Sequence, residues 1–119
     1  MNHRLRKDEL LRHNQDIERV LFRGKRLQDG AVRVYYRPAV EPGNRRAGVI
    51  TAGKFPNAVT RNRVRRQLRE IFRTNKEQFP LGYDYLLRAD KTALTLKYDM
   101  LNSMVLGLVG KLAPGTGGS

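Results

Sequence analysis

At 119 residues the chain is long enough for one domain with a buried core, and its 39% hydrophobic and 29% charged residues are typical of a globular protein. Its 24 Lys and Arg against 11 Asp and Glu give a formal charge of +13, which favours a polyanionic partner because such a partner relieves the repulsion among the cations. The absence of cysteine excludes disulfides, thiolate metal sites and a cysteine nucleophile.

The apolar runs are too short for a signal peptide or a membrane span. Near the start only Leu10 and Leu11 are adjacent, and the longest apolar run covers residues 104–109. A membrane-surface partner would need a basic amphipathic helix with a large apolar face. We therefore expect a cytoplasmic protein with no membrane partner.

Residues 1–13 are polar and basic, and we expect them to form a flexible segment. The next ten residues predict a short helix over 14–23, because Asn14 is a favourable N-cap residue and Gly24 is a typical helix stop. The packed side of this helix would carry the apolar residues at helical spacing, which are Ile17, Val20 and Leu21.

Two strands are predicted next, over residues 32–36 and 46–53, with a Pro-Gly pair at the centre of a type II turn over residues 41–44. We expect these strands to pair as an antiparallel hairpin. On the first strand, a period of two places Arg33, Tyr35 and Arg37 on one face. A ring between two cations resembles a platform for single-stranded nucleic acid, although a partly exposed strand face has the same pattern.

The arginine-rich segment over residues 60–75 predicts an amphipathic helix. Its apolar sector consists of Val64, Leu68, Ile71 and Phe72. Its opposite sector consists of Asn62, Arg65, Arg66, Arg69 and Arg73. Glu70 is the only acidic residue in the segment, so the repulsion among the arginines is largely unrelieved. A solvated charged face is the alternative, but the guanidinium suits bidentate contact with phosphate and stacking on bases. We interpret this side as a nucleic-acid surface. The sequence shows no partner helix of a helix-turn-helix motif, so it gives no indication of duplex DNA.

A third strand over residues 83–89 and a final helix over residues 96–112 complete the predicted elements. The final helix would pack through Leu101, Val105, Leu108 and Leu112. Residues 113–119 are a glycine-rich tail that we expect to be disordered. The whole pattern predicts one α+β domain over residues 14–112, in which helices cover part of a mostly antiparallel sheet.

Residues 57–66, Asn-Ala-Val-Thr-Arg-Asn-Arg-Val-Arg-Arg, together with Leu68-Arg69-Glu70 and Phe72-Arg73, resemble the signature of the bacterial ribonuclease P protein subunit. The resemblance covers about residues 10–112. It implies an α+β fold with about four strands, like the second domain of ribosomal protein S5, with the arginine helix inside a left-handed βαβ crossover. It further implies binding of the ribonuclease P catalytic RNA and of the single-stranded 5′ leader of precursor tRNA.

Taken with the two faces described above, the resemblance assigns two sets of binding residues. The set that faces the catalytic RNA is Lys54, Asn57, Arg61, Asn62, Arg63, Arg65, Arg66, Arg69 and Arg73. The set in the leader cleft is Ile17, Leu21, Arg33, Tyr35 and Arg37. Family members commonly have Phe where Ile17 and Leu21 stand here, and Phe22 falls on another side of the helix. Pro56 also replaces a glycine that usually precedes Asn57.

We expect no catalytic residue and no metal site on the protein. His3 and His13 lie in or beside the N-terminal segment, and Asp84, Asp90 and Asp99 show no metal-binding spacing. The resemblance implies that magnesium is bound mainly by the RNA, which performs the hydrolysis, and no obligatory protein partner is evident. Two alternatives remain open on the sequence, an rRNA-packaging protein and an independent metal-dependent nuclease.

Overall fold

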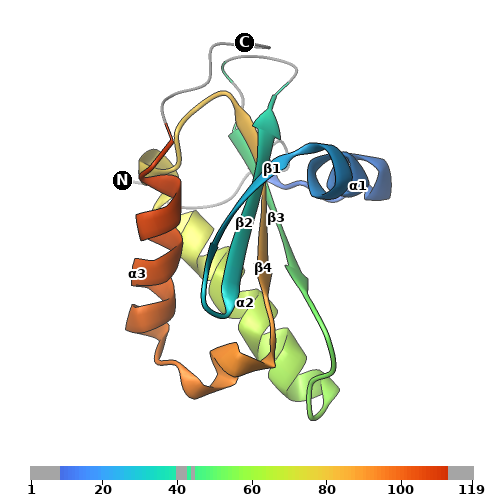
Figure 1. Cartoon of the computed structure of the whole chain (residues 1–119), viewed down its shortest axis with the longest axis vertical. Helices are drawn as coiled ribbons and strands as arrows, with labels where there is room; N and C mark the ends of the chain where they lie inside the picture. Colours follow the sequence, from blue (N-terminus) through green and yellow to red (C-terminus); the bar gives the residue numbers. More distant parts are fainter. Residues whose placement is uncertain (1–8, 40–42, 44, 113–119) are drawn as a thin grey trace.

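The computed structural model describes residues 9–39, 43 and 45–112. These residues form one α+β domain in which a mixed four-stranded sheet lies between helices on both of its faces (Figure 1). The strands are β1 (Lys25–Asp29), β2 (Val32–Pro38), β3 (Arg45–Thr51) and β4 (Tyr83–Ala89), in the order β1-β2-β4-β3. The helices are α1 (Asn14–Arg23), α2 (Ala58–Thr74) and α3 (Tyr98–Val109), with short 3-10 turns η2 (Lys76–Gln78) and η3 (Lys91–Thr95).

The predicted hairpin between β2 and β3 is wrong. β2 pairs antiparallel with β1 and β4, whereas β3 pairs parallel with β4. Five of the seven residues of β4 are buried, so this strand takes a central position between the other two. The turn predicted over residues 41–44 lies largely outside the described residues. Because α2 connects β3 to β4, the βαβ crossover that carries the arginine-rich helix is confirmed.

Strand β1 is missing from the sequence prediction. Its residues are polar, and only Leu27 is partly buried, so the strand lacks the alternation that identifies β2. The available signal is Gly30, because glycine at the first of two loop residues suits a type II′ hairpin turn. Asp29 is the register partner of Val32, and Gly30 has a φ of 55°, which glycine adopts without steric cost.

The larger core lies between the sheet and the helices α2 and α3. The apolar sector predicted for α2 is confirmed, since all four of its residues are buried, namely Val64, Leu68, Ile71 and Phe72. Phe79 lies between Phe72 and Tyr85 in edge-to-face contacts, with ring centroids 5.0 and 5.2 Å apart. From α3, the buried residues are Leu101, Val105, Leu108 and Val109, while Leu112 beyond the helix is partly buried.

Helix α1 covers the opposite face of the sheet, on the other side from α3 (Figure 1). A smaller core forms there from Leu11, Val20, Tyr35 and Leu86, with Ile17, Leu21 and Ile50 packed against it. Polar residues of β1, β2 and β4 beyond the helix remain at the surface. This partly covered face is where the larger of the two hollows described below lies.

The chain before α1 lies along the outer edge of β3. Leu10 forms a parallel bridge with Ala47, and the Leu11 N–H donates to the Ala47 carbonyl at 3.0 Å. Lys76 Nζ donates to Glu9 Oε1 at 3.1 Å, which ties this segment to the end of α2. These contacts cover the sheet edge that β3 would otherwise expose. No helix in the described ranges has the length and apolar character needed to cross a bilayer.

Candidate nucleic-acid interface

The outer side of α2 is the first candidate surface. Asn57 caps the helix, since its Oδ1 accepts the Thr60 N–H at 2.9 Å while the Thr60 hydroxyl donates to the Asn57 carbonyl at 2.9 Å. This bond leaves the first turn of the arginine helix well formed. Asn57 therefore has a structural role that accounts for its place in the motif, whether or not it also contacts RNA.

Most of the predicted RNA-facing residues are solvent exposed, namely Lys54, Asn62, Arg63, Arg65, Arg66 and Arg69, while Arg61 is partly buried. In the part of the chain that the structure describes, no carboxylate pairs with any of them. Arg73 differs, because its Nε donates to Glu70 Oε2 at 2.9 Å and its second nitrogen bonds the other oxygen. That pairing raises the pKa of Arg73 and lowers the pKa of Glu70.

A groove of about 300 Å³ joins this side of α2 to α1. Arg65 and Arg69 form one wall, and Arg12 and Ile17 lie on the other side of β3. Ile17 thus lines this groove and not the α1 cleft, although Ile17 and Leu21 both pack against the smaller core. The groove needs Gly48, because a Cβ there would lie 2.8 Å from the Leu11 carbonyl oxygen.

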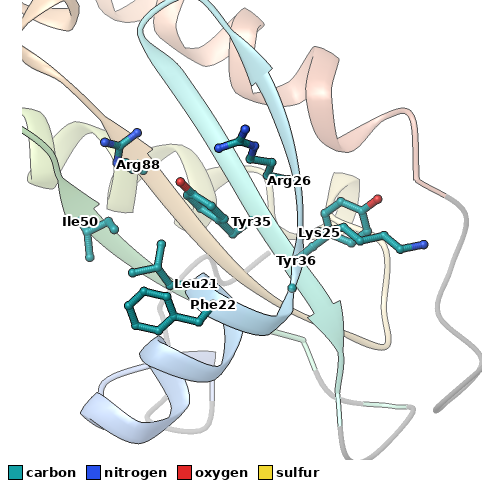
Figure 2. Close-up of a pocket in the computed structure, with 9 residues that line it drawn as sticks. Leu21, Phe22, Lys25, Arg26, Tyr35, Tyr36, Ile50 and Arg88 are labelled. Atoms are coloured by element: carbon teal, nitrogen blue, oxygen red, sulfur yellow. The ribbon is translucent and has the colours of Figure 1, made fainter.

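A second hollow, of about 770 Å³, lies at the end of α1 (Figure 2). We call it the α1 cleft, and its lining residues are Leu21, Phe22, Gly24, Lys25, Arg26, Tyr35, Tyr36, Ile50 and Arg88. Figure 2 shows the Tyr35 side chain between Arg26 and Arg88, with Leu21 and Phe22 on the helix below it. No acidic side chain is among these lining residues, so the α1 cleft suits an anionic ligand.

Tyr35 lies among the arginines of the α1 cleft. Its Oη accepts a hydrogen bond from Arg33 at 3.3 Å, and Arg33 Nε also donates to Gln28 Oε1 at 3.1 Å. Burial by itself raises the pKa of Tyr35, but the hydrogen bond from Arg33 and the charges of Arg88 and Arg33 outweigh it, so the pKa is lowered. The side chain is only 7% exposed, so its ring is not an open stacking platform.

The structure separates the five predicted leader residues. Leu21 and Tyr35 line the α1 cleft, and Arg33 reaches it through its bond to Tyr35. Ile17 lies in the groove beside α2. Arg37 shares the strand face with Tyr35, as predicted, but lies at the far end of β2 opposite Asp84 and does not line the α1 cleft.

Sequence reasoning missed several residues of the α1 cleft, namely Phe22, Lys25, Arg26, Ile50 and Arg88. Arg88 had a usable signal in the sequence. The alternation on β4 places it on the other face of the strand from Tyr85 and Leu87, and it pairs in register with Arg33. Arg26 had none once β1 was overlooked, since only the pairing of Arg26 with Tyr35 brings it to this face.

An ion-pair network attaches α1 to the sheet. Arg46 donates to both carboxylate oxygens of Asp84, at 2.9 and 2.8 Å, and a further guanidinium nitrogen lies 3.6 Å from Asp16 on α1. The hydrogen bond to Asp84 raises the pKa of Arg46. Asp84 is only 8% exposed, so the bidentate pair is well shielded from water. The network therefore joins α1 to β3 and β4.

The acidic residues at these surfaces do not fit a magnesium site. Asp84 and Glu70 are each bonded to an arginine, which competes with any cation for the carboxylate oxygens. Across residues 9–39, 43 and 45–112, no three His, Asp or Glu side chains lie close enough together to hold a metal ion.

Comparison with known proteins assigns this chain to a family. The Ribonuclease P family profile matches residues 5–113. The chain belongs to the ribonuclease P protein family. It is 40% identical over 111 residues to the ribonuclease P protein component of Petrotoga mobilis, covering 90% of this chain and 93% of that relative. It is 38% identical over 101 residues to the component from Pelotomaculum thermopropionicum, covering 85% and 89%.

The solved structure of the ribonuclease P protein from Thermotoga maritima has the same fold. It superposes with a TM-score of 0.77 at 29% identity, covering 87% of this chain and 97% of that one. The resemblance found in the sequence and the predicted α+β fold are therefore both confirmed.

Proposed function

We propose that this chain is the RNA-binding subunit of a ribonuclease P ribonucleoprotein that removes the 5′ leader from precursor tRNA. The observation that carries this proposal is the row of exposed arginines on α2, Arg65, Arg66 and Arg69, for which the described part of the chain offers no carboxylate partner. Such a surface binds a phosphate backbone by releasing its counterions. The names of the relatives support the same assignment.

In this proposal the two surfaces have separate partners. The arginine side of α2 holds the catalytic RNA, and the α1 cleft with Arg33 and Tyr35 holds the single-stranded leader. The RNA, with magnesium, cleaves the phosphodiester bond. The protein places cations between the RNA and the leader, which lowers the repulsion between them and so strengthens the binding of substrate and metal.

A cleavage assay at low magnesium tests the proposal. Precursor tRNA is incubated with a ribonuclease P RNA, with and without this protein, and with the protein alone. We expect efficient cleavage only when RNA and protein are both present. No effect of the protein would leave an rRNA-packaging role as the better explanation, and cleavage without the RNA would identify an independent nuclease.

Arg65 and Arg69 test the assignment of α2 to the catalytic RNA. Replacement of either arginine by alanine should weaken RNA binding and reduce the slope of log affinity against log salt by about one unit, because it removes one phosphate contact. Filter binding across a salt series measures the slope. Arg19→Ala is the control, since this exposed cation lies on α1, which covers the opposite face of the sheet from α2. Equal slopes for Arg69→Ala and Arg19→Ala would remove α2 from the interface.

A further inference from the structure

Phe22 has an aromatic ring that is not packed into either core of the protein. Its side chain is 77% exposed at the last turn of α1. Among the large apolar residues exposed in the described ranges, the others are aliphatic or a methionine, namely Val59, Leu81 and Met100. Leu21, its neighbour, is instead partly buried in the small core under α1.

The ring lies at the rim of the α1 cleft, which is lined by cations. Lys25, Arg26 and Arg88 line the same cleft, and none of its lining residues is acidic (Figure 2). The sequence pattern alone places Phe22 on a different side of the helix from Ile17 and Leu21. Phe22 nevertheless lines the α1 cleft, because the chain turns at Gly24 and brings β1 alongside the end of the helix.

An exposed aromatic ring at a cleft lined by cations and by no acidic residue is typical of a binding site for single-stranded nucleic acid. A base stacks on the ring whatever its sequence, while the guanidinium groups hold the adjoining phosphate. An anionic membrane fits less well, because α1 presents Asp16 and Glu18 beside a single exposed ring. Ile17 and Leu21 cannot supply the stacking surface, since both are aliphatic and packed against the small core.

We propose that Phe22 stacks on a base of the single-stranded leader bound in the α1 cleft, and so sets the preference for precursor over mature tRNA. This inference rests on the function proposed above and names the residue that recognises the leader. It moves the stacking position by one residue, from Leu21 to Phe22, relative to the pattern expected for the family.

The test measures affinities of the reconstituted ribonucleoprotein for precursor and mature tRNA. Phe22→Ala should reduce the precursor preference about tenfold, because stacking on one base accounts for a change of this order. Phe22→Leu should lose as much, since it keeps the apolar surface without a ring, and Phe22→Trp should retain the preference. Met100→Ala, which removes an exposed apolar side chain from α3, should change nothing. Thermal unfolding of each variant checks that the fold is intact.

Phe22→Trp also gives a direct readout, because the chain has no tryptophan. Its fluorescence should respond to a leader-length oligonucleotide and to precursor tRNA, but not to mature tRNA or to phosphatidylglycerol vesicles. An unchanged precursor preference in Phe22→Ala would overturn the stacking role and leave the proposed function standing. A response to vesicles without one to the oligonucleotide would also overturn it. If the unaltered protein shows no precursor preference, both proposals fail.

Discussion

Replacing Gly24 by alanine is expected to lower the free energy of unfolding by about 3 kcal/mol. A Cβ at this position would lie 2.4 Å from the Val20 carbonyl oxygen and 2.7 Å from that of Tyr36. Both are backbone atoms, so no side-chain rotation relieves the overlap. The end of α1 must therefore move away from β2, which opens the small core beneath it. Thermal melting should detect a drop of roughly 12 °C for a domain of this size.

Gly107→Ala is the matched control. Gly107 lies inside α3, is exposed, and has no atom within 4 Å of the position that a Cβ would occupy. Alanine there should stabilise the protein by about 0.5–1 kcal/mol, because glycine is a poor helix former. The Gly24 variant should also weaken precursor tRNA binding while it keeps its affinity for the catalytic RNA, since α2 lies on the other face of the sheet. Equal stability of the Gly24 and Gly107 variants would contradict the steric argument.

Gly24 also illustrates how a correct prediction can have a different cause. The sequence rule that ends helices at glycine depends on a left-handed conformation. Here Gly24 ends α1, but its φ of −82° and ψ of 170° are extended and open to any residue. Glycine is needed because two backbone segments approach each other at this point. That approach involves Tyr36, twelve positions along the chain, so no local pattern reveals it.

Sequence patterns predicted burial correctly where the periodicity of a single helix or strand determines it. The apolar sector of α2 follows from the helical period alone, and Phe72 and Leu68 are buried as that period requires. Strand pairing is a different problem, because it depends on which strands compete for the centre of the sheet. β4 occupies that place because it is buried on both faces, with Leu86 in the smaller core and Leu87 in the larger one. The sequence prediction paired β2 with the next predicted strand along the chain, because local patterns do not show which strand occupies the centre of the sheet.

The α1 cleft has the same nonlocal origin. Its cations come from β1 and β4, which lie on either side of β2 only after the sheet has formed. The arginine side of α2 was visible in the sequence because a single helix carries it. The sequence therefore predicts the surface assigned to the catalytic RNA much better than the surface assigned to the leader.

Asp84→Ala is expected to destabilise the protein by about 2 kcal/mol, because it removes the bidentate partner of Arg46 and leaves that guanidinium partly buried. The cost falls below that of a fully buried pair, since the Arg46 side chain is 24% exposed and also lies near Asp16. Urea unfolding of Asp84→Ala, Arg46→Ala and the double variant measures the coupling. The double variant should cost less than the sum of the two, because no unpaired charge remains.

Arg19→Ala provides the comparison, since it breaks an ion pair with Asp16 whose arginine is 43% exposed. Its cost should stay below about 0.5 kcal/mol, as is usual for surface pairs. If Asp84→Ala costs no more than Arg19→Ala, the network does not hold α1 to the sheet. If it does hold α1, the loss of Asp84 should reduce stability and the preference for precursor tRNA together, and should leave the affinity of α2 for the catalytic RNA unchanged. That combination separates a positioning role for Asp84 from a general loss of folded protein, which would lower both RNA affinities equally.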